Sequence, residues 1–296
     1  MDSEDRFQKI RRVLIYILLL NWGVSAAKLI YSGVIRSVSM KADGFHSFSD
    51  GASNIIGLIG IWVASRPIDQ NHPYGHKKYE TLTSVAISAL LFFVCFNVIR
   101  EGIARFIDPV IPEGNLNAFL VMIVTMAVNI FVMVYENKKG KELKSDVLIS
   151  DALHTRSDIL TSASVIITLM AIKLGIPVVD PIASLLIAIF IGYAAVQILR
   201  ESARVLSDGA AIPIWEIKRV VLAIKGVEEC HQIRSRGRAD DIHIDLHILV
   251  DQKMDVHRAH HLSYAIENKI KRDFRGVTDV VVHMEPMETE RNKRGI

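Results

Sequence analysis

A pattern with one histidine between two aspartates occurs twice in the sequence. Residues 43–50 read DGFHSFSD and residues 151–158 read DALHTRSD, so both copies fit Asp-x-x-His-x-x-x-Asp. Side chains three and four residues apart lie on one face of an α-helix, so each copy would present its imidazole and carboxylates in a single row. Two facing pairs of His and Asp would form a four-ligand N2O2 site, which suits a divalent transition metal and above all zinc. The residues concerned are Asp43, His46 and Asp50 in the first copy and Asp151, His154 and Asp158 in the second.

Each copy of the motif runs into a long apolar stretch. IIGLIGIWVA follows the first copy and ILTSASVIITLMAI follows the second. Ionisable groups in such surroundings are costly and usually belong to ion sites, relays or substrate pathways. A single copy could equally be a polar helix start, with a cap followed by solvated residues. The repetition of the motif favours a metal site over that alternative.

Six segments that could cross a bilayer must position the two motifs, since about 20 apolar residues suffice for one crossing. The second and fifth segments carry the motifs and are the most polar, so we expect them to face the interior of a helix bundle. Lys and Arg gather in the N-terminal tail, after the second segment and before the fifth, which places both termini in the cytoplasm. The segments are expected near residues 13–34, 38–65, 79–103, 115–136, 147–173 and 181–200.

The depths of the two motifs in the bilayer agree. Asp50 lies about 13 residues, or roughly 20 Å, below the outer start of the second segment. His154 lies about 8 residues, or roughly 12 Å, above the cytoplasmic start of the fifth. In a hydrocarbon core about 30 Å thick these levels nearly coincide, close to the midplane where substrate sites of transporters usually lie.

A second set of candidate ligands lies in the loop RPIDQNHPYGHKKYE, between the second and third segments. Asp69, His72 and His76 are spaced i, i+3 and i+7 and are joined by a Pro-x-Gly turn. Two imidazoles and a carboxylate would form a second metal site or a vestibule at the cytoplasmic mouth. The alternative is a water-facing polar loop, because three ligands leave one coordination position for solvent.

Composition divides the chain into an apolar and a polar region. Hydrophobic residues make up 50% of the 296 residues and the mean hydropathy is +0.29, but the long apolar runs end near residue 200. We therefore expect an α-helical membrane domain over residues 1–208 and a cytoplasmic domain over residues 209–296.

The polar region predicts a small α+β domain of ferredoxin-like order αββαβ. Residues 212–225 have helical periodicity, residues 227–236 predict a strand, and residues 241–250 alternate between apolar and polar types. Residues 256–274 predict an amphipathic helix and residues 278–285 a last strand. Helices should cover one face of a small mixed sheet.

Several histidines of this domain could converge on one carboxylate. A single histidine on an exposed strand is more often solvated than metal-bound, but the histidines here fall on three strands and one helix. Taken as a group they favour a metal site, formed by His231, His247, His260, His283 and Glu285.

Several classes of function lack the residues they need. The net charge of +3 is too small to indicate nucleic-acid binding, and no aromatic-interleaved basic patch is present. Cys95 and Cys230 form no Cys-x-x-Cys pair, which excludes a disulfide framework and a zinc finger. The sequence contains neither HExxH nor a Walker A motif, so zincin proteolysis and direct use of ATP are excluded, and we expect no prosthetic group.

Together, the six segments, the paired motifs, the HPYGHKKYE loop and the C-terminal module resemble the cation diffusion facilitator family of divalent-metal/proton antiporters. The resemblance covers nearly the whole chain. It implies a homodimer in the cell membrane that exports divalent cations, Zn²⁺ foremost, from the cytoplasm in exchange for protons and is not an enzyme. By this resemblance the transport site is His46, Asp50, His154 and Asp158, the loop site is Asp69, His72 and His76, and regulatory metal binds between two cytoplasmic domains at His231, His247, His260, His283 and Glu285.

The resemblance also bears on further charged residues and on the ion. Lys78 and Asp208 match a charge pair that locks the dimer at the membrane surface, and Asp43 and Asp151 would line the proton or ion path. The loop of residues 137–146 is basic and without histidine, which indicates a prokaryotic-type protein. A His-Asp/His-Asp quartet goes with zinc and often cadmium in this family, whereas harder aspartate sets suit manganese. Transport of Fe²⁺, Mn²⁺, Co²⁺ or Cd²⁺ stays open.

Proton exchange follows from the chemistry of these ligands. Metal binding needs neutral imidazoles and ionised carboxylates, so loading expels protons, and histidine with its ordinary pKa of about 6.5 suits this exchange. A membrane metal sensor would use the cytoplasmic histidines but would not need a buried four-ligand site. An intramembrane metalloenzyme would need an open coordination position with a general base beside it, and neither is visible.

Overall fold

A computed structural model of the chain describes residues 3–35, 38–107, 116–173 and 179–287. The side chains of Asp43, His46 and Asp50 lie outside this description, although the helix that carries them lies within it. The chain divides into two compact units, residues 1–202 and residues 203–296.

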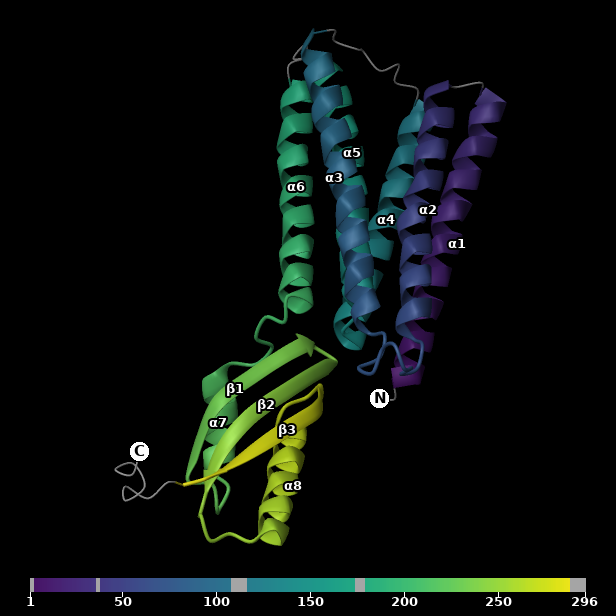
Figure 1. Ribbon diagram of the computed structural model, residues 1–296. Coiled ribbons are helices and arrows are strands. Elements are labelled where there is room, and N and C mark those ends of the chain that lie inside the picture. The colour runs from purple at the N-terminus through teal and green to yellow at the C-terminus, as the bar shows by residue number, and fades with distance from the viewer. Residues whose placement is uncertain (1–2, 36–37, 108–115, 174–178, 288–296) are drawn as a thin grey trace. The chain divides into compact units, whose positions relative to one another are not determined.

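The first unit is built from six long helices, as the sequence predicts (Figure 1). Even the shortest helix, with 27 residues, is about 40 Å long, which exceeds the roughly 30 Å of a hydrocarbon core. Within the described residues, three helical stretches are both long and apolar enough to cross a membrane: Glu4–Ile30, Lys78–Ala104 and Ile182–Leu206. The helices are α1 (Ser3–Ile35), α2 (Val38–Ala64), α3 (Lys78–Ile107), α4 (Leu116–Leu143), α5 (Asp146–Lys173) and α6 (Val179–Leu206).

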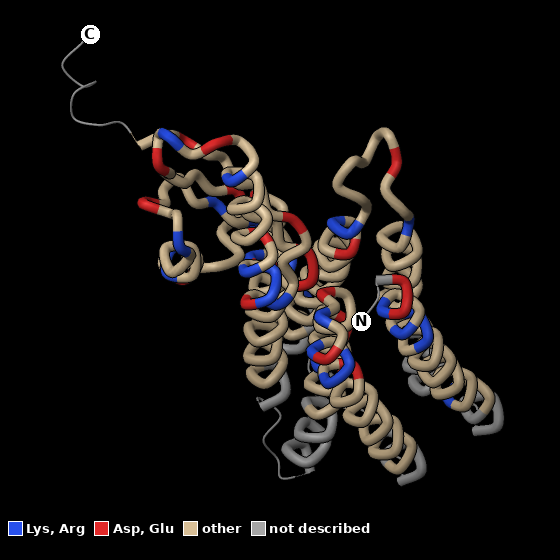
Figure 2. The backbone as a smooth tube through the Cα atoms, turned by 90° about the horizontal axis from the view of Figure 1, so that it is seen from below, with Lys and Arg blue, Asp and Glu red and all other residues tan. Residues whose placement is uncertain are grey.

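Apolar side chains hold these helices together. Leu14 of α1, Ile61 of α2, Ile87 of α3, Val132 of α4 and Leu148 of α5 belong to one buried cluster. A second cluster joins α3 to α6. Figure 2 shows that long stretches of the helices carry no charged residue, whereas charged residues gather toward the end at which α1 begins. This distribution is the one expected of helices that cross a bilayer.

A buried ion pair ties three parts of this unit together near the start of α1. Arg6 Nη2 lies 3.0 Å from Glu80 Oε2, and both side chains are almost fully buried. Arg6 also donates from Nε to the carbonyl oxygen of Leu143 at 2.7 Å and from Nη2 to that of Lys144 at 2.8 Å. Ser145 Oγ donates to Glu80 Oε1 at 2.6 Å. Arg6 therefore satisfies carbonyl groups that the C-terminus of α4 leaves without helical partners.

The second unit has the predicted order αββαβ. Its elements are α7 (Ile214–Leu222), β1 (Glu229–Arg238), β2 (Asp241–Val250), α8 (Val256–Asp273) and β3 (Val277–Pro286). β2 lies in the centre of the sheet, antiparallel to β1 and parallel to β3. The predicted helix over residues 212–225 is shorter than expected, because Pro213 caps it in an extended conformation and Gly226 follows with a φ of +101°.

Both helices of this unit cover one face of the sheet. Ile217 of α7 and Ile266 of α8 are fully buried in one cluster with Ile244 and Leu246 of β2. The apolar residues of β2 alternate with His243, Asp245 and His247, because successive strand side chains point to opposite faces. The polar face of β2 is therefore available for a site.

We predict that Glu80→Gln destabilises the first unit by about 3 kcal/mol or more, because it removes the carboxylate charge beside the buried Arg6 guanidinium. The exposed pair between Lys9 and Asp5 provides a matched control. Asp5→Asn should cost less than about 1 kcal/mol, since water screens that pair. Equilibrium unfolding of both variants in detergent measures the difference, and equal losses would contradict this account of the ion pair.

Candidate metal centres

The second copy of the repeated motif lies inside the first unit. His154 is buried, and its Nε2 lies 4.0 Å from Asp158 Oδ2, one turn further along α5. The Nδ1 atom of His154 has no hydrogen-bond partner among the described residues. Both side chains line a cavity whose other walls come from α1, α2 and α4, through Asn21, Val24, Ser53 and Asn129.

The first copy of the motif falls on α2, which also lines this cavity. The side chains of Asp43, His46 and Asp50 lie outside the described residues, so their convergence with His154 and Asp158 stays a prediction. The α2 backbone carries Asp50 three positions before the cavity residue Ser53. The helix that the sequence analysis pairs with α5 is therefore one of the walls of the cavity.

A buried polar network accompanies the cavity. Asn21 donates to Asn54 at 3.0 Å, and Asn54 donates to Asp151. The carboxyl group of Asp151 lies against that of Glu136, which accepts from Thr155 at 3.2 Å. Both acids are almost fully buried, and each has one oxygen without a hydrogen-bond partner in the described part of the chain.

Glu136 is a residue that the sequence analysis missed. It stands at the end of the predicted fourth segment, where a single acid reads as the polar boundary of a membrane crossing. The available signal was its type: an acid that directly follows an apolar run is costly unless it has a partner. Its partners, Asp151 and Thr155, lie on α5 and cannot be inferred from the local pattern.

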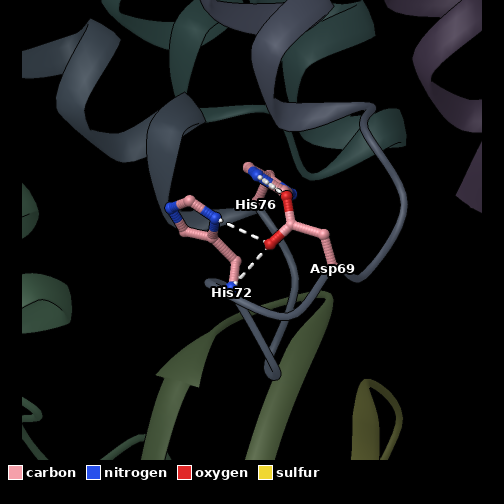
Figure 3. Close-up of side chains that lie close together, drawn as sticks. All are labelled: Asp69, His72 and His76. Atoms are coloured by element: carbon pink, nitrogen blue, oxygen red, sulfur yellow. Dashed lines mark hydrogen bonds and ion pairs between the residues drawn. The ribbon is translucent and has the colours of Figure 1, made fainter.

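The loop residues Asp69, His72 and His76 come together as Figure 3 shows. The Asp69 carboxylate lies between the two imidazoles, with Oδ1 3.1 Å from His72 Nδ1 and Oδ2 3.4 Å from His76 Nε2. One ligand atom from each residue lies within 4.8 Å of the other two. Gly75 adopts a φ of +82° between the histidines, which a residue with a side chain would adopt only with strain.

Local hydrogen bonds keep the Asp69 carboxylate charged. Desolvation acts to raise its pKa, but the backbone N–H groups of His72 and Asn71 and the His72 ring together lower it. The backbone bonds measure 2.7 Å from His72 and 2.9 Å from Asn71. His76 is buried whereas His72 is partly exposed. The loop thus offers an ionised oxygen ligand next to one buried and one partly exposed imidazole.

The polar face of the sheet gathers the cytoplasmic group, which we define as His231, His247, His283 and Glu285. In the strand register His247 of β2 pairs with His231 of β1 and with His283 of β3. Glu285 follows His283 by two residues on the same face. Its carboxylate lies 2.7 Å from His247 Nδ1, 3.3 Å from His231 Nε2 and 3.7 Å from His283 Nε2.

The backbone of β1 and the charge of Glu285 both favour a ligand role. The β1–β2 register shifts between His231 and Arg234, where Gln232 has a φ of +47°. Such bulges re-aim side chains at the edge of a sheet. The hydrogen bond with His247 is the main cause that lowers the pKa of Glu285, with further contributions from the charges of His231, His247 and His283.

One sequence prediction, the part of His260 in the cytoplasmic group, is not realised within one chain. His260 lies on α8 and packs edge-on against Tyr264, at 4.8 Å between ring centroids, rather than joining the cytoplasmic group. Asp208 is paired with Arg236 at 3.3 Å. It stays a prediction that His260 binds metal between two chains. The pairing of Asp208 with Lys78 also stays a prediction.

A bundle of membrane-length helices with a buried His–Asp pair, followed by an αββαβ domain with its own His–Glu group, defines a membrane transporter of metal cations. Residues 14–207 match the cation efflux transmembrane domain, and residues 212–287 match the cytoplasmic domain of cation efflux proteins. The chain belongs to this family, the cation diffusion facilitators.

Relatives match over almost their whole length. An uncharacterized transporter of Methanocaldococcus jannaschii is 32% identical over 94% of this chain and 99% of its own. The manganese efflux system protein MneP of Bacillus subtilis is 27% identical over 96% of this chain and 98% of its own. A crystal structure of the cytosolic domain of a cation diffusion facilitator family protein is 30% identical, covers 24% of this chain and 86% of that chain, and has a TM-score of 0.23.

We predict that Zn²⁺ binding by the cytoplasmic group weakens at least tenfold as the pH falls from about 7.5 to about 5.5, because protons compete for imidazole nitrogens. The carboxylate of Glu285 should not limit binding in this range, since its pKa is lowered and it stays ionised. The Zn²⁺ affinity of the full chain is measured at each pH by competition with a fluorescent zinc chelator. The contribution of the cytoplasmic group is the difference in Zn²⁺ binding between wild type and His247→Ala. A loss of binding only near pH 4 would instead identify the carboxylate as the controlling group.

Proposed function

We propose that the protein exports Zn²⁺ from the cytoplasm in exchange for protons, through a site formed by His46, Asp50, His154 and Asp158. The observation that carries this proposal is the pair of buried His154 and partly buried Asp158, which lines a cavity between α1, α2, α4 and α5. Imidazole and carboxylate ligands suit zinc, and a four-ligand set matches its preferred tetrahedral geometry. The relative MneP is named for manganese, so Mn²⁺ is the competing substrate.

Electrostatics supports an exchange of one divalent cation for protons. With neutral imidazoles and ionised carboxylates the four ligands carry a net charge of about −2, which is costly in a low-dielectric interior. A bound Zn²⁺ neutralises this charge, and so do two protons. The empty, deprotonated site is then the least stable state, which favours direct replacement of metal by protons.

We further propose that Glu136 and Asp151 take part in the proton transfer. Two neighbouring carboxylates away from water form a site that could take up and release a proton. Asp151 lies one turn before His154 on α5, and Thr155 links Glu136 to the same turn. The pair would hold a proton close to the transport site without occupying a metal ligand.

We propose the following orientation and assembly of the chain in the membrane. Both termini lie in the cytoplasm, which the positively charged loops support. The chain acts as a homodimer in the membrane, with the membrane domain over residues 1–208 and the cytoplasmic domain over residues 209–296. Metal bound by the loop site and by the cytoplasmic group would regulate transport from the cytoplasmic side.

We predict that Asp158→Ala abolishes Zn²⁺ uptake into proteoliposomes under an imposed pH gradient, because it removes an ionised ligand from the buried site. Asp5→Ala, which removes an exposed carboxylate at the protein surface, should retain the wild-type rate. Gel filtration before reconstitution, together with equal amounts of protein in the vesicles afterwards, separates lost transport from lost folding. Wild-type flux in Asp158→Ala would refute the site, and flux of Mn²⁺ in preference to Zn²⁺ would correct the substrate.

We predict that Glu136→Gln lowers proton-coupled Zn²⁺ transport at least tenfold while leaving Zn²⁺ binding within about twofold of wild type, since the amide keeps the size and the Thr155 contact but cannot carry the proton. Simultaneous recording of Zn²⁺ and of lumenal pH with a fluorescent indicator checks the coupling. Ser157→Ala, which alters another buried polar side chain, on α5, serves as the control. Unaltered coupling in Glu136→Gln would remove this residue from the proton path and leave the metal site untouched.

A further inference from the structure

Two histidines of α8 form a pair that belongs to none of the sites described above. His257 and His261 are one helical turn apart, and their Nε2 atoms lie 3.2 Å from each other. The ring centroids are 4.5 Å apart and the ring planes meet at 85°. Both side chains are exposed at the surface of the second unit. Two imidazole nitrogens therefore lie close together in a place that water and ions can reach.

The separation of the two nitrogens fits a shared metal ion. Zinc–imidazole bonds are about 2.0–2.1 Å long, so nitrogens 3.2 Å apart subtend about 100° at an ion bound to both. This angle lies between those of square-planar and tetrahedral coordination. The same i, i+4 spacing on one helix places the two histidines of HExxH sites on a common zinc ion. An ion could bind here without rearrangement of the helix.

We propose that His257 and His261 form a surface chelate for a divalent transition-metal ion on α8, with water in the remaining coordination positions. A donor set made only of imidazoles favours Cu²⁺, Ni²⁺ and Zn²⁺ over Mn²⁺ and Mg²⁺, which prefer oxygen ligands. The site therefore selects for a narrower class of ions than the carboxylate-containing groups of this chain.

The neighbouring residues are compatible with a bound cation and give it no catalytic role. The residues between the pair are Arg258, Ala259 and His260, so the general-base glutamate of HExxH motifs has no counterpart. The Arg258 guanidinium is directed to Asp255, with Nε 3.4 Å from Oδ2, and Asp255 also caps the helix by accepting from the Arg258 N–H. A carboxylate thus offsets the positive charge near the pair.

The competing explanation is a hydrogen bond in which one neutral imidazole donates to the other, which the same 3.2 Å separation would permit. Residue-resolved chemical modification distinguishes the two. Diethyl pyrocarbonate modifies exposed imidazole nitrogens, and a metal bound to both Nε2 atoms blocks the reaction. The full chain in detergent is treated with and without Zn²⁺, and fragmentation mass spectrometry reads each histidine separately. The variants are His257→Gln, His261→Gln and, as the control on the same helix, His260→Gln.

We expect Zn²⁺ to slow the modification of His257 and His261 by diethyl pyrocarbonate at least tenfold, both in wild type and in His260→Gln. In His257→Gln the protection of His261 should fall at least tenfold, because a single imidazole loses the advantage of the second ligand. Mn²⁺ at the same concentration should protect neither residue. Absence of Zn²⁺ protection would leave only the hydrogen bond, and protection of His261 that survives His257→Gln would assign the metal to other ligands; either result overturns the chelate.

Discussion

The cost of placing charge in an apolar interior is the constraint on which the first unit depends. Several buried ionisable groups of its described part have partners from distant segments. Arg6 reaches Glu80 and the end of α4, and Asp151 accepts from Asn54. Because each such contact joins different helices, the requirement to pair charges also fixes how the helices pack.

The loop site and the cytoplasmic group are held together by different means. The backbone positions their ligands locally: a glycine turn separates His72 from His76, and strand register brings His231, His247 and His283 side by side. The carboxylates of Asp69 and Glu285 reach water, so their charges cost little there. These groups can therefore be occupied or empty without endangering the fold, which suits regulation better than transport.

Periodicity in the sequence was sufficient to predict the order of elements. The six apolar segments and the alternation over residues 241–250 correspond to the six long helices and to β2. The sequence did not predict contacts between residues that lie far apart along the chain. Arg6 is separated from Lys144 by 138 positions, and Glu136 looks like a segment end until α5 packs beside it. The bulge that re-aims His231 likewise leaves no local signal.

Candidate ligands were easier to predict than their grouping. Spacing on one element found Asp69, His72 and His76, because a short loop leaves few ways to arrange them. Spacing on separate strands found the cytoplasmic group only as a set, and it included His260, whose helix directs it to Tyr264 within the chain. The pair on α8 was not predicted although its i, i+4 spacing is a local signal, because convergence across strands does not include two ligands supplied by a single helix turn. A pair of ligands on one helix turn can thus be recognised from local spacing, whereas the grouping of ligands from separate elements depends on long-range packing.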